Sequence, residues 1–249
     1  MKALILAAGY ATRLYPLTTN TPKCLLPVGS VTILDRLLGK LAALKEVTEI
    51  LIVTNSKFYP QFLNWKINVR CRLPVRIIDD GTRTNGARLG AVGDFRLAIQ
   101  SEKINSDTLL LASDNLFDQD LGEFVAYGLK QSPAVSVATY DLGDPGLAAG
   151  KFGVFEVNPD GKVIGMEEKP AAPQSALIGV GVYFFPAGSL GLIDVYLKDP
   201  EAKDAPGFFI RWLRENGTRI FAFQFKGMWY DIGDLKSLEE ANRVFQSKK

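Results

Sequence analysis

Short apolar runs alternate with helix-like stretches over the first half of the chain. The strand-like segments read KALILAAG, EILIVTN, PVRIIDD and DTLLLASDN. Between them, the spacing of apolar positions predicts helices over residues 33–44, 59–65 and 90–99. Apolar runs of this length, bounded by turn residues and separated by helices, are typical of parallel strands covered on both faces. The pattern therefore predicts an α/β fold with a doubly wound, mostly parallel sheet and helices on both faces.

After residue 132 the pattern changes to strands with little helix between them. The strand-like segments are AVSVATYDL, FGVFEVNPDGKVIGMEEKP, LIGVGVYFFP and TRIFAFQFKGMWYDIG, and NPDG at residues 158–161 predicts a hairpin turn. Helices are expected over residues 189–199, 206–216 and 234–249, the last one amphipathic. We therefore expect a single domain, residues 1–249, whose halves, about 1–132 and about 133–249, share one sheet.

Composition narrows the class of protein. The chain has 249 residues, 47% of them hydrophobic, which is enough for a substantial core. Its formal net charge of +2 gives no reason to expect a nucleic-acid partner. No N-terminal signal or apolar stretch of membrane-spanning length is present, and Cys24 and Cys71 are far apart and without metal-ligand spacing. We expect free thiols and a cytoplasmic protein that does not bind membranes.

The sequence contains no histidine. Its absence excludes Ser-His and Cys-His nucleophilic pairs and zinc sites that use histidine ligands. Carboxylates, lysines, arginines and backbone amides are left to carry any chemistry.

Open α/β sheets bind ligands at the carboxyl ends of their strands, so the turns after Ala7, Ile78 and Ala112 are the first places to look. In LAAGYATRL, Gly9 and its small neighbours allow backbone amides to approach an anion, and Arg13 can grip phosphate oxygens. A glycine after a first strand also serves packing, so this turn alone does not identify a site. Lys23, in the proline-stiffened loop TPKCLLPVG, can reach back toward a phosphate held by the turn.

Together, LAAGYATRL and TPKCLLPVG resemble the N-terminal signature of the sugar-1-phosphate nucleotidyltransferases, such as glucose-1-phosphate thymidylyltransferase and UTP-glucose-1-phosphate uridylyltransferase. The resemblance continues through LLASDNLF, FGVFEV, MEEKP, IGVGVYFF and WYDIGDLKSLEEAN, and so covers nearly the whole chain. It implies the Rossmann-like fold of nucleotide-diphospho-sugar transferases, with a nucleotide-binding half (about 1–132) and a sugar-phosphate-binding half (about 133–249). It also implies Mg²⁺-dependent transfer of a nucleoside monophosphate from a nucleoside triphosphate to a sugar-1-phosphate, with release of pyrophosphate.

The same resemblance implies a role for individual residues. The catalytic set would be Arg13, Lys23, Asp114, Lys169 and Asp231, with Asp114 and Asp231 as the Mg²⁺ ligands. The nucleotide would be bound by Leu6, Ala7, Ala8, Gly9, Tyr10, Ala11, Thr12, Arg13, Lys23, Asp79, Asp80 and Gly86. The sugar phosphate would be bound by Gly153, Glu168, Lys169, Gly179 and Val180. Trp229 and Tyr230, like Phe184 and Phe185, are expected in the core.

The segment expected to read the base departs from the family pattern. Asp79 or Asp80 stands where the family has Gln or Glu, and a carboxylate suits the N3 hydrogen of thymine or uracil or the amino group of cytosine. We expect dTTP or UTP as donor and glucose-1-phosphate as acceptor. No family role falls to Arg83 or Arg88, which we expect on the surface.

Two other functions remain open at this point. One is a cytidylyltransferase acting on another phosphorylated alcohol, and the other is a non-catalytic relative that binds nucleotide sugars as a regulatory subunit. A glycosyltransferase is disfavoured because SDNLFDQD lacks a paired Asp-x-Asp around Asp114. The oligomeric state is open, with a homo-oligomer among the possibilities.

Overall fold

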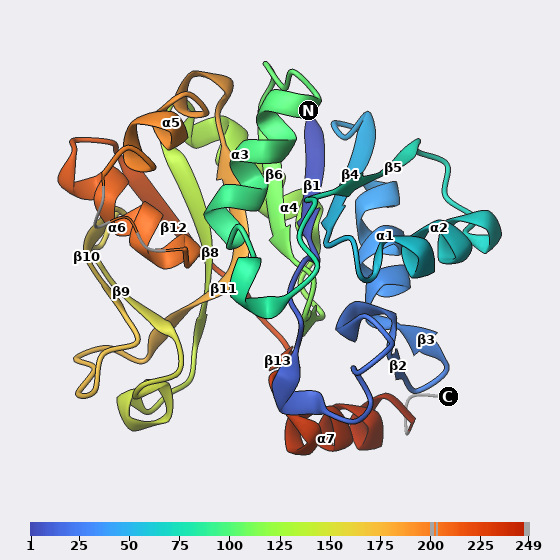
Figure 1. Cartoon of the computed structure of the whole chain (residues 1–249). Coiled ribbons are helices and arrows are strands. Elements are labelled where there is room, and N and C mark those ends of the chain that lie inside the picture. The colour runs from blue at the N-terminus through green and yellow to red at the C-terminus, as the bar shows by residue number, and fades with distance from the viewer. Residues whose placement is uncertain (200–201, 203, 247–249) are drawn as a thin grey trace.

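A mixed sheet of nine strands forms the centre of the molecule (Figure 1). The computed structural model describes residues 1–199, 202 and 204–246. The strands of the central sheet are β1 (Lys2–Leu6), β4 (Glu49–Thr54), β5 (Val75–Asp79), β6 (Thr108–Ala112), β8 (Val135–Asp141), β9 (Gly153–Val157), β10 (Val163–Glu168), β11 (Leu177–Phe185) and β12 (Ile220–Gln224).

The sheet has a parallel part and a largely antiparallel part. Strands β6, β1, β4 and β5 lie side by side in that order and all pair in parallel. Beyond β6, strand β11 pairs antiparallel with β6, β8 and β9, and β9 and β10 form the hairpin predicted around NPDG. One sheet thus crosses the predicted boundary at residue 132, at the contact between β6 and β11, while the division into two functional halves stays a prediction.

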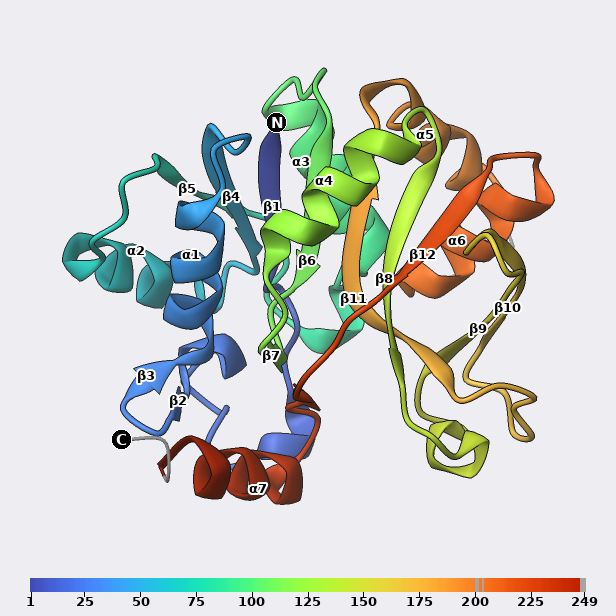
Figure 2. The same cartoon turned by 180° about the vertical axis from the view of Figure 1, so that it is seen from behind.

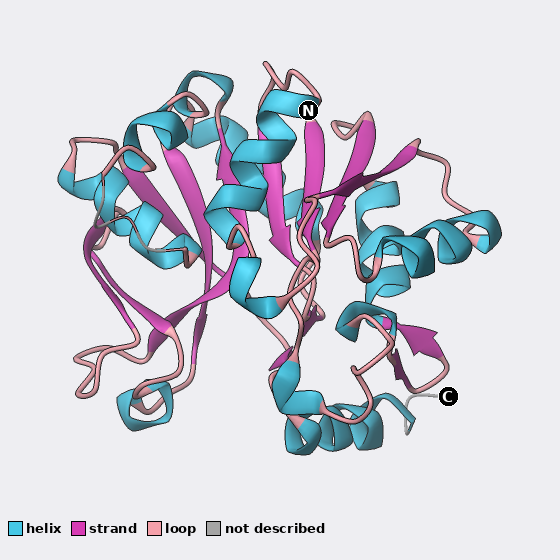
Figure 3. Cartoon of the chain, in the orientation of Figure 1, coloured by secondary structure: helices cyan, strands magenta, loops and turns pink. Residues whose placement is uncertain are grey.

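Helices cover both faces of this sheet, as Figures 2 and 3 show from opposite sides. They are α1 (Ile33–Ala43), α2 (Tyr59–Asn68), α3 (Ala91–Ser101), α4 (Leu121–Gln131), α5 (Leu192–Tyr196), α6 (Pro206–Glu215) and α7 (Leu235–Gln246). Side chains of successive strand residues point to opposite faces, so Ala3 and Ile5 of β1 pack with α1 and α4 while Leu4 packs with α3, α5 and α6. Both faces are therefore buried, as the continuous apolar runs predicted.

Most predicted elements are confirmed, with two differences. The expected helix over residues 189–199 is shorter, with a 3-10 turn η5 (Ala187–Ser189) before α5. Helix α4 was not predicted at all, because its sequence LGEFVAYGLKQ carries two glycines. Residues 247–249 of the predicted terminal helix lie outside the described part of the chain. Phe184 and Phe185 are fully buried, which confirms their place in the core.

A small separate core lies at the carboxyl end of β1 and β6. Besides η5, the described residues form the 3-10 turns η1 (Thr12–Leu14), η2 (Lys23–Leu25), η3 (Asn85–Ala87) and η4 (Pro145–Ala148). Two short sheets join β2 (Pro27–Val28) to β3 (Val31–Thr32) and β7 (Asn115–Phe117) to β13 (Trp229–Asp231). Leu14, Val28, Leu116, Ile232 and Leu238 pack together here. This cluster fixes the first turn, β13 and α7 against one another.

The start of α1 offers a direct test of local stability. The Thr32 hydroxyl accepts a hydrogen bond from the Asp35 amide at 3.0 Å and donates to the Asp35 carboxylate at 2.7 Å. Replacing Thr32 with alanine should lower the free energy of unfolding by about 1 kcal/mol, because the cap of the helix is lost. Urea unfolding would measure this loss, and Thr32→Ser, which keeps the hydroxyl, should lose clearly less.

Within the described residues, no helix is long and apolar enough to span a bilayer.

Candidate active site

A cavity of about 600 Å³ opens at the carboxyl ends of β1 and β6. Its walls come from both halves of the chain: the first turn, the loop of Lys23, the end of β6, the start of α3, and the segment leading into α6. The predicted site residues that line it are Leu6, Ala7, Ala8, Gly9, Ala11, Thr12, Arg13, Lys23, Asp114 and Lys169. Ten positions chosen from the sequence thus share one cavity wall.

Side chains from other segments hold the first turn in place. The Asn55 side chain, fully buried after β4, donates to the Ala8 carbonyl at 2.8 Å and accepts from the Phe58 amide at 3.0 Å. Ala11 adopts a left-handed conformation with φ 47°, and the buried Thr18 hydroxyl donates to its carbonyl at 2.8 Å. Such a conformation is unfavourable for alanine. The turn is therefore held in a fixed, partly strained shape, and neither Asn55 nor Thr18 was predicted.

Gly9 has no role in packing. A Cβ at this position would meet no atom within 4 Å, and its φ lies outside the left-handed region. Its backbone is exposed and lines the cavity. The open space beside Gly9 is therefore available to a ligand. Tyr10, by contrast, turns inward, is 5% exposed and packs against Phe58, so the cavity does not include it.

Lys23 and Asp114 form an ion pair across the cavity floor. The Lys23 ammonium lies 2.6 Å from Asp114 Oδ2, and both side chains are mostly buried. The other carboxylate oxygen of Asp114 accepts from the Asn115 amide group at 3.0 Å, and Asn115 in turn accepts from the Trp229 indole N–H at 2.8 Å. The half-buried Trp229 thus orients Asp114 through Asn115. Asn115, which follows Asp114 in the sequence SDN, is the feature from which this chain of hydrogen bonds could have been predicted.

The fold brings Asp231 next to Asp114. In the antiparallel pair β7–β13, Asp231 lies opposite Asn115, and the Ile232 amide donates to the Asp114 carbonyl at 3.0 Å. Burial, followed by the negative charge of Asp114, raises the pKa of Asp231 to about 6, although the cations Lys23 and Arg13 oppose this shift. The two aspartates therefore repel each other and would gain from a shared cation.

Arg13 is exposed in η1 and lies over the segment that follows Asp231. Its guanidinium nitrogens are 3.7 Å from the position that a Cβ on Gly233 would occupy. Arg13 and Lys23 therefore act as two positive charges on Asp231, which does not itself line the cavity, beside Asp114, which does.

Most residues of the second half that line the cavity are not the ones that the sequence predicted. Lys169 follows β10, has a left-handed φ of 52° and lines the cavity. Gly181 and Tyr183 of β11 line it as well, whereas Val180 is 1% exposed in the core and Gly179 lies against Phe155. The sequence prediction placed the contact of β11 on Gly179 and Val180, and the structure places Gly181 at the wall instead. The alternation of side chains along a strand accounts for Val180, which points away from the wall, whereas Gly179 is covered by the Phe155 ring.

Gly153 and Glu168 lie opposite each other in the hairpin β9–β10, away from the large cavity. Glu168 lines a second hollow of about 330 Å³ between the hairpin and α6. Its carboxylate fills the space beside Gly207 at the start of α6, and burial raises its pKa. The structure therefore places neither residue at the wall where the other predicted groups meet.

The segment expected to read a base is also rearranged. Gly86 lies in the exposed turn η3, and Gly90 is the glycine at the cavity wall. Gly90 precedes α3 with φ +81°, and a Cβ there would lie 2.2 Å from Asp204 Cβ, so only glycine fits. Asp79 is exposed and accepts from the Ser56 hydroxyl at 2.7 Å, while Asp80 is buried. Gly86 lies four residues before the glycine that lines the cavity, and a role for Gly86 in nucleotide binding stays a prediction.

Arg88 is exposed, as expected, but it also has a place at the site. It lines the cavity and pairs with Asp204 at 3.3 Å, and the Asp204 carbonyl accepts from the Val92 amide at 3.2 Å. The start of α6 is thereby attached to the start of α3, which closes the cavity between the two halves.

The chain is similar to known nucleotidyltransferases. The model of the Nucleotidyl transferase family matches residues 2–248. The bifunctional protein GlmU of Methanococcus aeolicus is 27% identical over 97% of this chain, and a glucose-1-phosphate adenylyltransferase of Clostridium novyi is 28% identical over 97%. The chain spans 54% and 66% of the lengths of these two relatives.

A solved structure has the same fold. It belongs to a Bacillus anthracis protein described as a candidate glucose-1-phosphate thymidylyltransferase, in complex with sucrose. It superposes with a TM-score of 0.78 over 100% of this chain and 96% of the other, at 24% identity. Because the family model matches residues 2–248, the chain belongs to the nucleotidyl transferase family, as its resemblance to the sugar-1-phosphate nucleotidyltransferases predicted.

Proposed function

We propose that this protein transfers a nucleoside monophosphate from UTP or dTTP to a sugar-1-phosphate, with glucose-1-phosphate as the favoured acceptor, and releases pyrophosphate. The observation that carries the proposal is the meeting of Arg13, Lys23, Asp114 and the open backbone at Gly9 in one cavity. The relatives named above supply the class of reaction. Two free thiols suit the reducing cytoplasm, where we place this activity.

The reaction joins two anions and needs little proton transfer. An oxygen of the sugar phosphate attacks the α-phosphorus, a new P–O bond forms, and the bond from that phosphorus to the β-phosphate oxygen breaks. The attacking oxygen is already ionised at neutral pH, so a chain without histidine lacks nothing that this chemistry requires. The protein must instead hold the two phosphates in line and neutralise charge on the leaving group.

The chain's own residues divide this work by position. Arg13 and the amides of residues 8–12 would hold the triphosphate at the first turn. Lys23 lies in the loop opposite the first turn. It would give up its ion pair with Asp114 and contact oxygens of the α-phosphate instead. Lys169, from the second half, would direct the incoming phosphate toward the same point.

The acidic residues suit Mg²⁺. Asp114 and Asp231 offer hard oxygen ligands, and a cation bound between them would relieve the repulsion between the two carboxylates. No group of three or more His, Cys, Asp or Glu side chains that could hold a metal occurs among the described residues. Mg²⁺ commonly binds one or two carboxylates together with substrate phosphates and water, so two aspartates fit it. When bound, the ion would neutralise charge on the phosphates.

Release of pyrophosphate tests the proposal. Each common nucleoside triphosphate would be combined with glucose-1-phosphate, other sugar-1-phosphates and phosphorylated alcohols, with Mg²⁺ and with a chelator. We expect turnover with UTP or dTTP and a sugar-1-phosphate only when Mg²⁺ is present. Turnover with CTP and a phosphorylated alcohol would instead identify a cytidylyltransferase, and silence in every combination would favour a non-catalytic nucleotide-sugar-binding relative.

Gly9 allows binding to be separated from folding. Gly9→Ala should leave the free energy of unfolding unchanged or raise it by up to about 1 kcal/mol, because the added methyl has room and restricts the unfolded chain. We expect the same methyl to occupy the space of a phosphate oxygen and to weaken nucleotide binding by at least about tenfold. Calorimetry with UTP and urea unfolding would measure the two effects. A variant that loses stability but binds UTP normally would contradict a phosphate site at this turn.

A further inference from the structure

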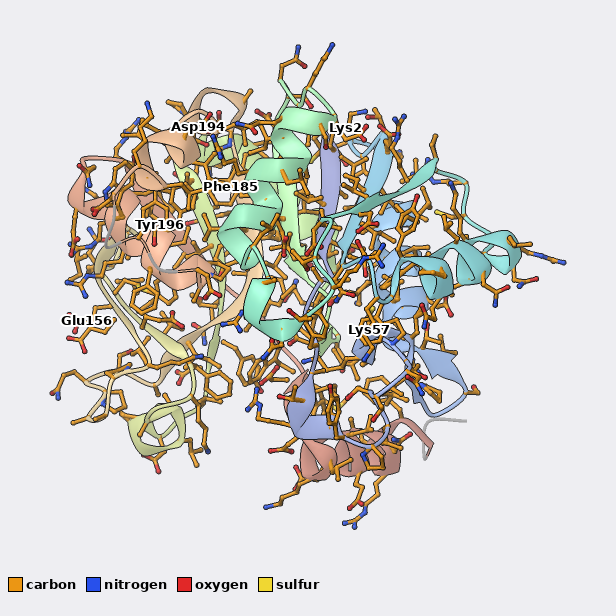
Figure 4. All side chains as sticks on the ribbon, in the orientation of Figure 1. Lys2, Lys57, Glu156, Phe185, Asp194 and Tyr196 are labelled. Atoms are coloured by element: carbon orange, nitrogen blue, oxygen red, sulfur yellow. The ribbon has the colours of Figure 1, made fainter. Side chains whose placement is uncertain are left out.

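The loop of residues 15–22, which follows the first turn, is attached to the start of α2. The Lys57 ammonium donates to the Thr19 carbonyl at 2.6 Å, and the Gln61 side chain donates to the Asn20 carbonyl at 3.2 Å. Lys57 lies between β4 and α2, and Gln61 lies in α2 itself (Figure 4). Two side chains of a neighbouring segment therefore hold the backbone of this loop.

The segment that provides these donors is fixed in the core. Phe58 and Phe62 are 1% and 0% exposed and belong to the large core cluster on the α1 face of the sheet. The Lys57 ammonium lies 5.0 Å from the centre of the Phe58 ring, a distance at which a cation is attracted to an aromatic face. Asn55 begins this segment and holds the Ala8 carbonyl. One rigid segment thus contacts both the first turn and the loop that follows it.

The loop acts in turn on the first turn. Next to Thr19, the hydroxyl of the fully buried Thr18 donates to the Ala11 carbonyl at 2.8 Å. The Leu14 amide donates to the same carbonyl at 3.0 Å, so this oxygen is held by two donors. Ala11 has φ 47°, a left-handed conformation that is unfavourable for alanine. These two hydrogen bonds must therefore stabilise the conformation, and one of them depends on where the loop places Thr18.

We propose that Lys57 is a positioning residue for nucleotide binding, because the loop that it holds keeps Thr18 on the carbonyl of Ala11. This inference rests on the function proposed above. Among the described residues, Lys57 lies outside the cavity wall, so it acts without touching the ligand. The amides of the first turn and the Arg13 guanidinium would be ordered before a nucleotide arrives, and less conformational freedom is then lost on binding.

The experiment compares wild type, Lys57→Met, Lys57→Arg and Lys66→Met. Methionine keeps most of the side-chain volume but cannot donate, whereas arginine keeps a donor and a cation. Calorimetry would measure the affinity for UTP and for tripolyphosphate, which has no base, and pyrophosphate release would give kcat and KM. Lys57→Met should bind both probes about tenfold more weakly, with a matching rise in the KM for UTP, because the turn must be ordered on binding. It should leave kcat and the KM for glucose-1-phosphate within about twofold.

Lys66 provides the matched control, because it is an exposed lysine of the same helix. Lys66→Met should behave as wild type, and Lys57→Arg should bind UTP within about threefold of it. Amides of residues 15–20 should exchange their hydrogens faster in Lys57→Met than in the other three proteins. A purely structural role for Lys57 would reduce the folded fraction, and so lower kcat while the KM for UTP stays unchanged. That result would overturn the inference.

A second background distinguishes positioning from simple loss of charge. Glycine adopts the left-handed conformation without strain, so Ala11→Gly lessens the need for the hydrogen bond from Thr18. In the Ala11→Gly protein, Lys57→Met should weaken tripolyphosphate binding by no more than about threefold. An equal loss in both backgrounds would show that Lys57 acts through its charge alone, and would overturn the inference while leaving the transfer reaction intact. If neither UTP nor tripolyphosphate binds the wild type, the proposed function fails, and the inference fails with it.

Discussion

Replacing Lys23 with alanine should lower kcat by about 100-fold or more, which corresponds to about 3 kcal/mol of transition-state stabilisation. The expected loss is large because Lys23 is a mostly buried cation fixed at the cavity floor, 2.6 Å from Asp114. In the proposed reaction, charge moves toward the leaving pyrophosphate, and a positioned ammonium would stabilise that charge without rearrangement. Steady-state rates of pyrophosphate release would measure kcat and KM separately.

Lys2 offers a matched control. It also forms an ion pair, with Glu49, but lies at the amino end of β1, far from the cavity (Figure 4). Lys2→Ala should leave kcat within about twofold, because neither Lys2 nor Glu49 lines the cavity. Circular dichroism would confirm that both variants fold. Equal kcat values for Lys23→Ala and wild type would remove Lys23 from the mechanism.

Asp94→Asn should make the protein more stable at alkaline pH. The pKa of Asp94 rises from an ordinary 3.8 to about 7 in the folded chain. The native state therefore holds a proton that the unfolded state has lost, and stability falls as the pH rises from about 4 through about 7. Between about pH 5 and about pH 8, the wild type should lose about 2–3 kcal/mol through this group.

Urea unfolding of both proteins at these two pH values gives the comparison. Asparagine cannot ionise, so the variant should lack this part of the pH dependence and exceed the wild type most at the higher pH. Parallel pH profiles would show that Asp94 is ionised in the folded protein already at acidic pH.

The sequence predicted the architecture well because burial on both faces leaves a strong pattern. Short apolar runs such as LILAA and ILIV, bounded by turn residues, indicated central strands, and the intervening helices follow from their apolar spacing. Helix α4 was missed for a tertiary reason. A side chain at Gly128 would lie 2.5 Å from the Phe184 ring, so packing against β11 requires a residue that weakens the helix signal.

Contacts within one motif were more predictable than contacts between segments. The first turn, Lys23 and Asp114 follow from local signatures and do meet in one cavity. Asn55 supports that turn from 47 residues away, and no local pattern distinguishes it from any other asparagine after a strand. Gly90 and Gly181 were missed because neighbouring glycines, Gly86 and Gly179, satisfied the same pattern, and only the observed backbone decides which one reaches the wall.

The pairing of β13 with β7 has a consequence for the order of events during synthesis. Asp114 and Asp231 are separated by more than a hundred residues, so a ribosome must release the segment around β13 before the two carboxylates can meet. A nascent chain that has already completed the parallel strands β1, β4, β5 and β6 still lacks one of its two acidic groups. If the proposed sites are right, unfinished translation products would therefore present the first turn without the second acidic group, and should not consume nucleotides.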